Sequence, residues 1–240
     1  FRIIAITICL TVVIFCLKDT TFHLLLAPCD NHFVTFHLLE EVFERLKIDF
    51  RFEPYSIRLI NTELSSQFMT HVSTSVYLAL LLVSPYIVIE LYRYIAPALY
   101  VNERRYSVLL AIAIYLLFIL GVLMSYFVLF PFALRFLGTY QVAASVVNQI
   151  NLDSYISTFV TLTLMMGLVF QLPILSLFLA KMGILEAKFM KQYRRHAFVL
   201  ISIVAAVITP PDLFTCIMVL LPMYGLYEVS IFVVGKVSQG

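Results

Sequence analysis

Six apolar segments follow one another along the chain, and the polar stretches between them carry most of its charged residues. A helix that crosses a bilayer needs about 20 apolar residues, and most of these segments approach or exceed that length. The pattern predicts an all-α integral membrane protein with six transmembrane helices. The predicted spans are Ile3–Leu17, Phe68–Leu91, Tyr106–Phe130, Ser154–Ala180, Ala197–Thr209 and Leu213–Val234.

The fifth and sixth predicted helices are short. Ala197–Thr209 has 13 residues, so as a helix it would reach only roughly 20 Å, less than a hydrocarbon core of about 30 Å. Pro210 and Pro211 would end it, because proline lacks the amide donor that a helix needs. Asp212 then stands at the N-cap position of the last helix, which Pro222 is expected to interrupt. The hairpin would either thin the bilayer beside partner proteins or pack deep against its own bundle.

The positive charges orient the predicted spans. Ten of the 16 Lys and Arg residues fall on one side, which the positive-inside rule assigns to the cytoplasm. Five of the other six lie in the long loop 18–67, where that rule loses force, and Arg135 alone lies in a predicted short outer loop. Both termini are therefore predicted to be cytoplasmic (N-in/C-in).

The long outer loop 18–67 is predicted to have structure of its own. Within Phe36–Leu46, apolar residues recur at helical spacing with glutamates opposite them, which indicates an amphipathic helix on the outer face. Arg51–Thr62 is predicted to be extended. Six spans leave no room for a second, soluble domain, so residues 1–240 are predicted to form a single polytopic membrane domain.

The N-terminal segment is predicted to be a retained helix, because it lacks the small-x-small cleavage site of a secretory signal. The chain begins at Phe1 rather than Met. We therefore expect the natural N-terminus to extend further.

Composition narrows the function classes. The chain is 62% hydrophobic and 12% charged, against about 25% charged in soluble domains, and its net charge of +2 is too small to indicate nucleic-acid binding. Four cysteines lack metal-ligand spacing, and no zinc-protease, serine-hydrolase or phosphate-loop motif is present. Neither an enzyme, a cofactor nor a metal is predicted. A secondary transporter of small molecules or ions is the alternative, although the inverted repeats typical of that class are not apparent.

The loop Tyr92–Arg105 carries the most suggestive chemistry. Glu103 is the one acid among Arg93, Arg104 and Arg105. A carboxylate beside a bilayer can accept a visiting guanidinium bidentately, which indicates a receptor for an arginine-bearing partner. The alternative is that Glu103 only neutralises its neighbouring arginines.

Several short motifs, in the same order over the whole chain, resemble the family of the twin-arginine translocase subunit TatC. The combination of APALY…ERR with TPPD is the most specific part of the resemblance. The motifs are LAPCD (Leu26–Asp30), SPY (Ser84–Tyr86), YIAPALYVNERR (Tyr94–Arg105), FQLP (Phe170–Pro173), YRRHA (Tyr193–Ala197), TPPD (Thr209–Asp212) and LYE (Leu226–Glu228).

The resemblance implies a cup-shaped fold of six helices in the bacterial cytoplasmic (inner) membrane. It implies a receptor and core subunit of a protein translocase, which binds twin-arginine signal peptides and exports folded proteins with the proton gradient. Its implied partners are TatA- and TatB-type single-span proteins, membrane lipid and further copies of the chain in the active complex.

The resemblance also implies site residues. A second acid of the family's receptor site lies in an N-terminal segment that this chain lacks. The implied signal-peptide-binding residues are Tyr94, Pro97, Leu99, Glu103, Arg104 and Arg105. The implied structural residues are Pro28, Pro85, Pro210, Pro211, Asp212 and Glu228. We expect Glu228 to reach the interface or to pair with Arg93 or Lys236.

Gln171 departs from the family pattern, which usually has Glu before Leu-Pro. An amide cannot ionise, so a proton relay through this position is excluded. It could contact a partner, or it could make a structural hydrogen bond to another helix or to backbone freed by Pro173. Thr209 and Cys216 occupy the region where the family docks its single-span partners, although Gln is common at the Cys216 position.

Overall fold

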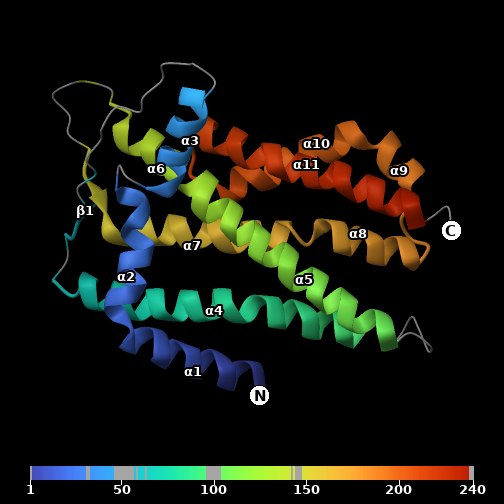
Figure 1. Ribbon diagram of the computed structural model, residues 1–240, viewed down its shortest axis with the longest axis horizontal. Coiled ribbons are helices and arrows are strands. Elements are labelled where there is room, and N and C mark those ends of the chain that lie inside the picture. The colour runs from blue at the N-terminus through green and yellow to red at the C-terminus, as the bar shows by residue number, and fades with distance from the viewer. Residues whose placement is uncertain are drawn as a thin grey trace. The chain divides into compact units, whose positions relative to one another are not determined.

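The computed structural model describes residues 2–30, 33–45, 57, 59–62, 64–95, 104–141, 143 and 148–237. Within these residues the chain is mostly helical (Figure 1). A bilayer core offers no water to backbone amides and carbonyls, so apolar segments satisfy these groups internally by forming helices. A small parallel sheet pairs Leu59 with Ile150 and Ile60 with Asn151.

Each predicted apolar segment forms helix, and further helices and two short strands lie between these segments. In chain order they are α1 (Arg2–Cys16), α2 (Lys18–Leu26), the 3-10 helix η1 (Ala27–Cys29), α3 (Val34–Arg45), β1 (Leu59–Ile60), α4 (Ser66–Ile95), α5 (Arg104–Met124), the π-helix η3 (Ser125–Leu129), α6 (Phe130–Thr139), β2 (Ile150–Asn151), α7 (Leu152–Val169), α8 (Leu172–Lys181), α9 (Ala187–Gln192), α10 (Arg194–Ile208) and α11 (Leu213–Val237).

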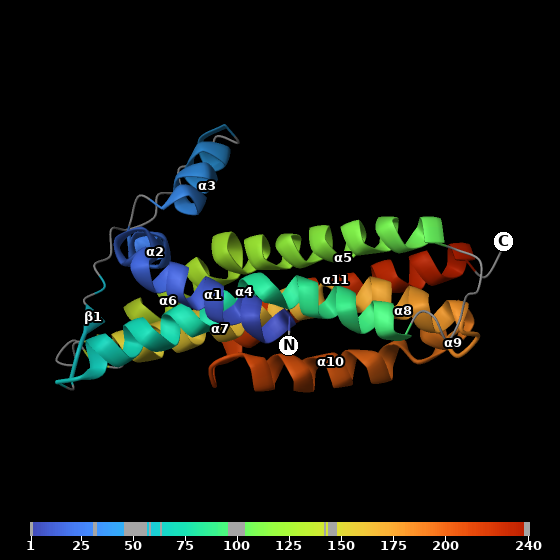
Figure 2. The same ribbon diagram turned by 90° about the horizontal axis from the view of Figure 1, so that it is seen from below.

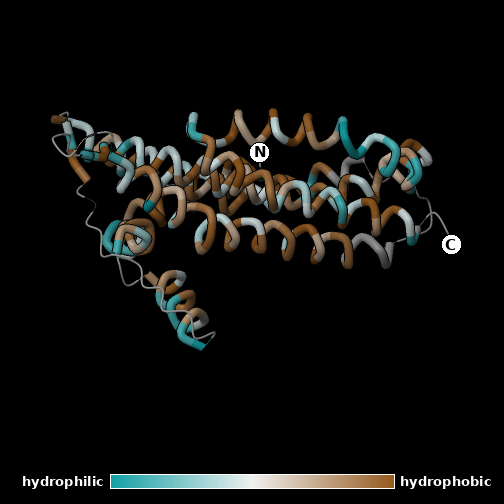
Figure 3. Tube along the Cα trace, turned by 90° about the horizontal axis from the view of Figure 1, so that it is seen from above, coloured by the Kyte–Doolittle hydropathy of each residue, from teal (hydrophilic) through white to brown (hydrophobic). Residues whose placement is uncertain are grey.

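Among the described residues, four helical stretches are long and apolar enough to cross a membrane, or five if one bent pair of helices counts as a span. Figure 3 shows these stretches as mostly hydrophobic. Both α1 and α10, of 15 residues each, form where spans are predicted, but six crossings with both termini inside stay a prediction. The four stretches are Ser66–Leu91, Leu109–Thr139, Leu152–Lys181 and Leu213–Lys236.

The predicted end of the third span is wrong. The third segment does not end at Phe130, because the helix continues through η3 and α6 to Thr139. Arg135 therefore lies in a helix rather than in an outer loop, with its guanidinium carbon 5.2 Å from the centre of the Phe36 ring. Ala133 and Leu134 are buried beside it, so residues that were expected to form a loop pack as part of the helix.

The sixth helix is not short, contrary to the prediction. Helix α11 has 25 residues and includes Pro222 without a break. Proline is tolerated inside membrane helices when nearby groups compensate for its missing amide donor. The expected interruption at this residue is therefore absent.

Contacts divide the chain into two compact units. The first comprises Phe1–Leu81 and Ser125–Val160, and the second comprises Leu82–Met124 and Thr161–Gly240. The boundaries cut α4 and α7 in mid-helix, so the two units share continuous helices.

The core of the first unit is aromatic. Phe33 and Phe36, at the start of α3, are buried against Tyr126, Phe127 and other apolar side chains. The predicted amphipathic helix within the outer loop is thus confirmed as α3. It is attached to the π-helix by the Thr35 hydroxyl, which donates to the Phe127 carbonyl.

The end of α2 is held by two tyrosines. The Tyr126 hydroxyl donates to the Leu24 carbonyl at 2.8 Å, and the buried Tyr155 hydroxyl donates to the Leu25 carbonyl at 2.6 Å. Carbonyls in the last turn of a helix lack the usual amide donor four residues later. At Leu24 that donor would come from residue 28, which is Pro28 and has no N–H.

In the second unit, α8, α9 and α10 all contact α11 (Figures 1 and 2). Met190 of α9 is buried against Ile231 and Val234 of α11. The Tyr227 hydroxyl on α11 donates to the Met190 carbonyl at 2.9 Å. This bond fixes the short helix α9 on the long helix α11.

Candidate functional site

Two glycines let the backbones of α5 and α7 approach closely within the second unit. A Cβ atom on Gly121 would lie 2.6 Å from the Met166 carbonyl oxygen, and one on Gly167 would lie 2.6 Å from the Phe118 ring. Membrane helices commonly use small residues in this way, because packing rather than hydrophobic burial drives their association. The close approach positions the next turn of α7 beside the backbone of α5.

The helix breaks in that next turn, between α7 and α8. The Gln171 amide N–H donates to the Leu168 carbonyl rather than to that of Gly167, four residues back. Helix α8 then begins at Leu172, with Pro173 in its first turn. The break therefore leaves the Gly167 carbonyl without its ordinary helical donor.

The Gln171 side chain fills this gap and reaches the neighbouring helix. Its Nε2 donates to the Gly167 carbonyl at 3.4 Å and to the Ile114 carbonyl of α5 at 3.2 Å. The predicted hydrogen bond to another helix is therefore confirmed. The second bond goes to the Gly167 carbonyl rather than to the Val169 carbonyl, which is the one that Pro173 deprives of a donor. The two bonds explain an amide at this position, because an ionised carboxylate would have no hydrogen to donate.

The other half of the same amide is unsatisfied. Gln171 is only 7% exposed, and its Oε1 is buried without a hydrogen-bond partner among the described residues. A buried polar atom without a partner usually costs about 1–3 kcal/mol. The site therefore keeps one acceptor that an incoming donor could satisfy.

The hairpin between α10 and α11 has the local structure that its sequence predicts. The N-terminus of α11 is capped by Asp212, whose Oδ1 accepts the Thr215 amide N–H at 2.6 Å, which confirms the predicted N-cap. Pro210 and Pro211 separate the two helices. The buried Thr209 hydroxyl donates back to the Ala205 carbonyl at 2.9 Å, and Cys216 is half-buried one turn into α11.

Glu228 pairs with Arg194 rather than with Lys236. Its Oε2 lies 2.7 Å from Nη2 of Arg194, the first residue of α10, while Oε1 accepts the Tyr224 hydroxyl at 3.2 Å. The alternative of pairing with Lys236 is therefore wrong, and the side chain of Arg93 lies outside the described residues. Lys236 instead lies over the Phe232 ring, 4.6 Å from its centre.

The predicted signal-peptide loop lies largely outside the described residues. This applies to Pro97, Leu99 and Glu103, and to the side chains of three residues whose backbones are described. Those three are Tyr94 in α4 and Arg104 and Arg105 at the start of α5. The helices on either side of the loop do pack together, since Val88 and Ile89 of α4 join Leu110 of α5 in one apolar cluster.

Two further prolines predicted to be structural are buried. Pro28 lies in η1 and Pro85 lies inside α4. No group of three metal-ligating side chains occurs within the residues that the structure describes.

Sequence reasoning missed several groups that build this site. The glycine contact and the Ile114 carbonyl were not anticipated, although paired small residues in apolar segments are a known signal of close helix packing. The Arg194–Glu228 pair was also missed. Nothing in the sequence spacing connects these residues, since they are on different helices.

Comparisons with known proteins agree on a single family. The family model described as Sec-independent protein translocase protein (TatC) matches residues 1–222. The TatC of Blattabacterium sp. subsp. Periplaneta americana is 36% identical over 233 residues, covering 95% of this chain and 88% of that protein. The Escherichia coli K12 TatC is 33% identical over 179 residues, covering 75% and 69%.

A crystal structure described as the twin arginine translocase receptor TatC matches the fold, with a TM-score of 0.68 and 25% identity over 100% of this chain and 99% of that one. A second TatC crystal structure, in DDM, matches with a TM-score of 0.66, covering 96% and 97%. These matches favour protein translocation over transport of small molecules or ions. Family model, relatives and fold together establish that the chain belongs to the TatC family of Sec-independent protein translocase proteins.

Proposed function

We propose that this chain is the receptor and core subunit of a translocase that binds twin-arginine signal peptides. In this proposal it exports folded proteins across the bacterial inner membrane, driven by the proton gradient, together with TatA- and TatB-type single-span partners. Membership of the TatC family is the observation that carries the proposal. The crystal structures that match the fold are described as the twin arginine translocase receptor, which supports the receptor role.

Glu103 is the proposed acceptor for a signal-peptide arginine. Because α5 begins at Arg104, residue 103 immediately precedes a helix N-terminus, where a negative charge is favoured. A guanidinium can pair with a carboxylate through two parallel hydrogen bonds, whereas an ammonium cannot. The position therefore suits a site that distinguishes arginine from lysine. Tyr94, Pro97, Leu99, Arg104 and Arg105 complete the proposed loop.

Binding of signal peptides to the full chain in lipid nanodiscs tests this role. We expect Glu103→Gln to weaken binding of a twin-arginine peptide about tenfold or more, since hydrogen bonds to charged groups contribute about 1.5–3 kcal/mol. Glu186→Gln is the matched control, because Glu186 is an exposed carboxylate in the loop before α9. Equal binding of twin-arginine and twin-lysine peptides to the wild-type chain would refute arginine-specific capture.

Gln171, Thr209 and Cys216 are the proposed contacts with single-span partners. The unpaired Oε1 of Gln171 supports this, since a donor from a partner helix would satisfy it. Thr209 is less available, because its hydroxyl already donates within α10. Cys216 is half-buried and presents only a weak donor.

Co-purification of a TatA- or TatB-type partner with the Gln171→Leu variant separates the two roles. Loss of association, with the unfolding midpoint of the isolated chain nearly unchanged, would support partner contact. Unchanged association would show that the amide is only structural. Leu221→Ala, on an exposed position of α11, is the control for a general effect of an altered membrane face.

A further inference from the structure

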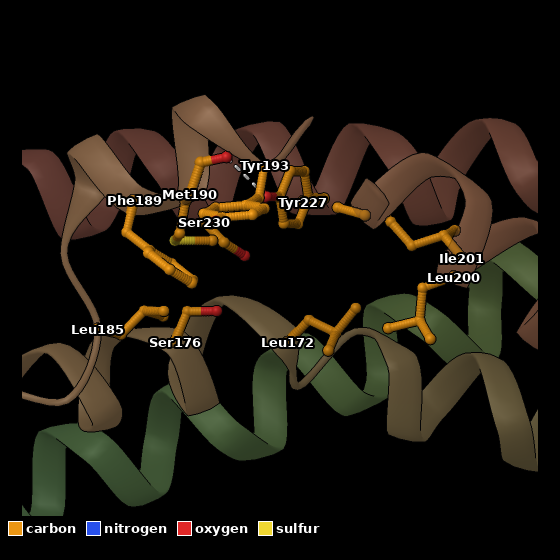
Figure 4. Close-up of a pocket in the computed structure, with 11 residues that line it drawn as sticks. Leu172, Ser176, Leu185, Phe189, Met190, Tyr193, Leu200, Ile201, Tyr227 and Ser230 are labelled. Atoms are coloured by element: carbon orange, nitrogen blue, oxygen red, sulfur yellow. Dashed lines mark hydrogen bonds between the residues drawn. The ribbon is translucent and has the colours of Figure 1, made fainter. Parts of the chain in front are cut away.

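A cavity of about 330 Å³ lies in the second unit, between α8, α9, α10 and α11 (Figure 4). Apolar side chains form most of its wall, and it is open on one side. Its volume lies at the lower end of the roughly 300–1,000 Å³ found for ligand pockets. The principal apolar lining residues are Leu172, Leu185, Phe189, Leu200 and Ile201.

Two serines bring hydroxyl groups to this apolar cavity, from α8 and α11 (Figure 4). Ser230 is committed, because its hydroxyl donates to the Leu226 carbonyl at 2.7 Å. Within the described residues no hydrogen bond is made by the Ser176 hydroxyl. The cavity therefore favours a mainly apolar ligand that also carries a hydrogen-bond acceptor.

Positive charges without a carboxylate partner among the described residues lie on α9 and α10, two of the helices that contribute to the wall. Lys188 and Lys191 are the sequence neighbours of the lining residues Phe189 and Met190, and Arg195 follows one turn later. All three cations are exposed, and within the described part of the chain none of them pairs with a carboxylate. Figure 3 shows the hydrophilic residues that gather at this end of α10.

The adjoining arginine behaves differently. Arg194 is neutralised by Glu228 of α11, with 2.7 Å between Nη2 and Oε2. The protein thus supplies a counter-ion for one cation of the group and leaves the remaining three to an external anion. Basic residues beside a cavity between membrane helices are the usual arrangement for an anionic lipid headgroup.

We propose that this cavity binds one acyl chain of an anionic phospholipid, whose phosphate is held by Lys188, Lys191 and Arg195. The apolar wall receives the chain, and the free Ser176 hydroxyl can donate to an ester carbonyl between the chain and the headgroup. A ligand with an apolar tail and an anionic head matches both parts of the site, whereas an apolar partner helix would leave the cations unpaired. The inference does not rest on the proposed signal-peptide function.

Native mass spectrometry of the full chain, purified in detergent, tests the headgroup contact. Phosphatidylglycerol and phosphatidylcholine with the same acyl chains are added separately. We expect tighter retention of phosphatidylglycerol, and a fall of about tenfold or more in Lys188→Gln/Lys191→Gln, since each cation near a lipid headgroup contributes roughly fivefold. Arg2→Gln/Lys18→Gln removes the same charge from exposed residues elsewhere and should leave retention unchanged.

The chain contact is tested by filling the cavity. Ala197→Phe places a ring among the lining residues and should reduce retention of both lipids, while Ala206→Phe on an exposed position of the same helix should not. Ser176→Leu is a second filling variant, in case the first does not fold. Equal retention of the two lipids by the wild-type chain, or full retention by folded filling variants, would overturn the proposal.

Discussion

The two compact units hold their helices together by different means. In the first unit, tyrosine hydroxyls donate to the carbonyls of Leu24 and Leu25 at the end of α2, and aromatic rings surround these bonds. In the second unit, Gly121 and Gly167 allow a backbone contact, and one amide, Gln171, bridges the helices with its donor while its acceptor stays unpaired. Each tyrosine hydroxyl donates its one hydrogen, whereas the Gln171 amide donates through Nε2 and leaves its Oε1 acceptor without a partner.

The difference bears on which unit can take up ligands. The tyrosine hydroxyls of the first unit already donate their hydrogens, so an additional molecule would add no bond there. Removing such a hydroxyl leaves a carbonyl unpaired. A half-satisfied bridge, such as Gln171, can gain a hydrogen bond when a partner arrives. The second unit also contains the cavity and the unpaired cations, so we expect binding functions there and a scaffold role in the first unit.

The largest effect is expected at the glycine contact. Gly121→Ala should destabilise the protein by about 1–3 kcal/mol, as overpacking does, because the new methyl group would lie 2.6 Å from the Met166 carbonyl oxygen. Gly225→Ala is the matched control, since no atom lies within 4 Å of its Cβ position on α11. That control should be neutral or stabilising by up to about 1 kcal/mol, from helix propensity.

Unfolding midpoints in a detergent titration measure both glycine variants. Equal midpoints for Gly121→Ala and Gly225→Ala would mean that α5 and α7 can separate at little cost. The stability of the second unit would then depend more on the Gln171 hydrogen bonds than on the close contact at Gly121.

Removal of one hydroxyl tests the satisfied bridge of the first unit. We expect Tyr155→Phe to lower the free energy of unfolding by about 1 kcal/mol, because the buried Leu25 carbonyl loses its donor. Tyr140→Phe, at an exposed position, should change it by less than about 0.5 kcal/mol. The same titration measures both, and indistinguishable variants would contradict a structural role for this bond.

The half-satisfied bridge should matter less to stability. Gln171→Leu is expected to cost only about 0.6 kcal/mol, the average for a hydrogen bond between membrane helices, because the substitution also removes the unpaired Oε1. A loss larger than that of Tyr155→Phe would reverse the comparison between the two units. Gln171→Asn retains an amide on a shorter side chain. Its stability shows whether the length of the side chain, which lets Nε2 reach the Ile114 carbonyl, is required.

Hydrophobic pattern alone anticipated most helices of both units, because apolar length is what a bilayer requires of a spanning segment. The N-cap at Asp212 could also be predicted, since capping depends on residues close in sequence. The partner of Gln171 could not. Its acceptor is a backbone carbonyl in another helix, and no residue type marks such a carbonyl.

Errors arose where tertiary packing overrides a local signal. Arg135 was expected in a short outer loop, yet it lies in α6 with its guanidinium over the Phe36 ring. Pro222 was expected to interrupt α11 and does not. Arg135 packs on a ring that comes from a distant part of the chain, and the sequence alone does not identify that neighbour.

A smaller effect is expected at the ion pair of the second unit. Arg194 and Glu228 are 46% and 34% exposed, so solvent screens them and their coupling should be about 0–1 kcal/mol. A double-mutant cycle with Arg194→Gln and Glu228→Gln measures it through the free energies of unfolding. The coupling should decrease with added salt, and a salt-independent value above that range would imply a buried and therefore more important pair.

The smallest effect is a pH dependence within the first unit. Burial raises the pKa of the Cys29 thiol, and its hydrogen bond with Tyr155 lowers that pKa only in part. The folded chain therefore keeps this proton to higher pH than the unfolded chain does. The resulting stability is fully present below the ordinary thiol pKa of about 8.5 and is lost as pH rises through the folded value.

Alkylation rates at Cys29 measure this shift, when the other three cysteines are replaced by Ala. The native chain should react more slowly than the chain unfolded in denaturant, and its rate should rise at a higher pH. Tyr155→Phe removes the hydrogen bond that favours the thiolate, so it should move the native profile further upward while Tyr140→Phe leaves it in place. A native pH profile that matches the unfolded one would mean that the aromatic packing of the first unit does not exclude water from η1. The contrast between the two units would then rest only on the hydrogen bonds of the first unit to the end of α2.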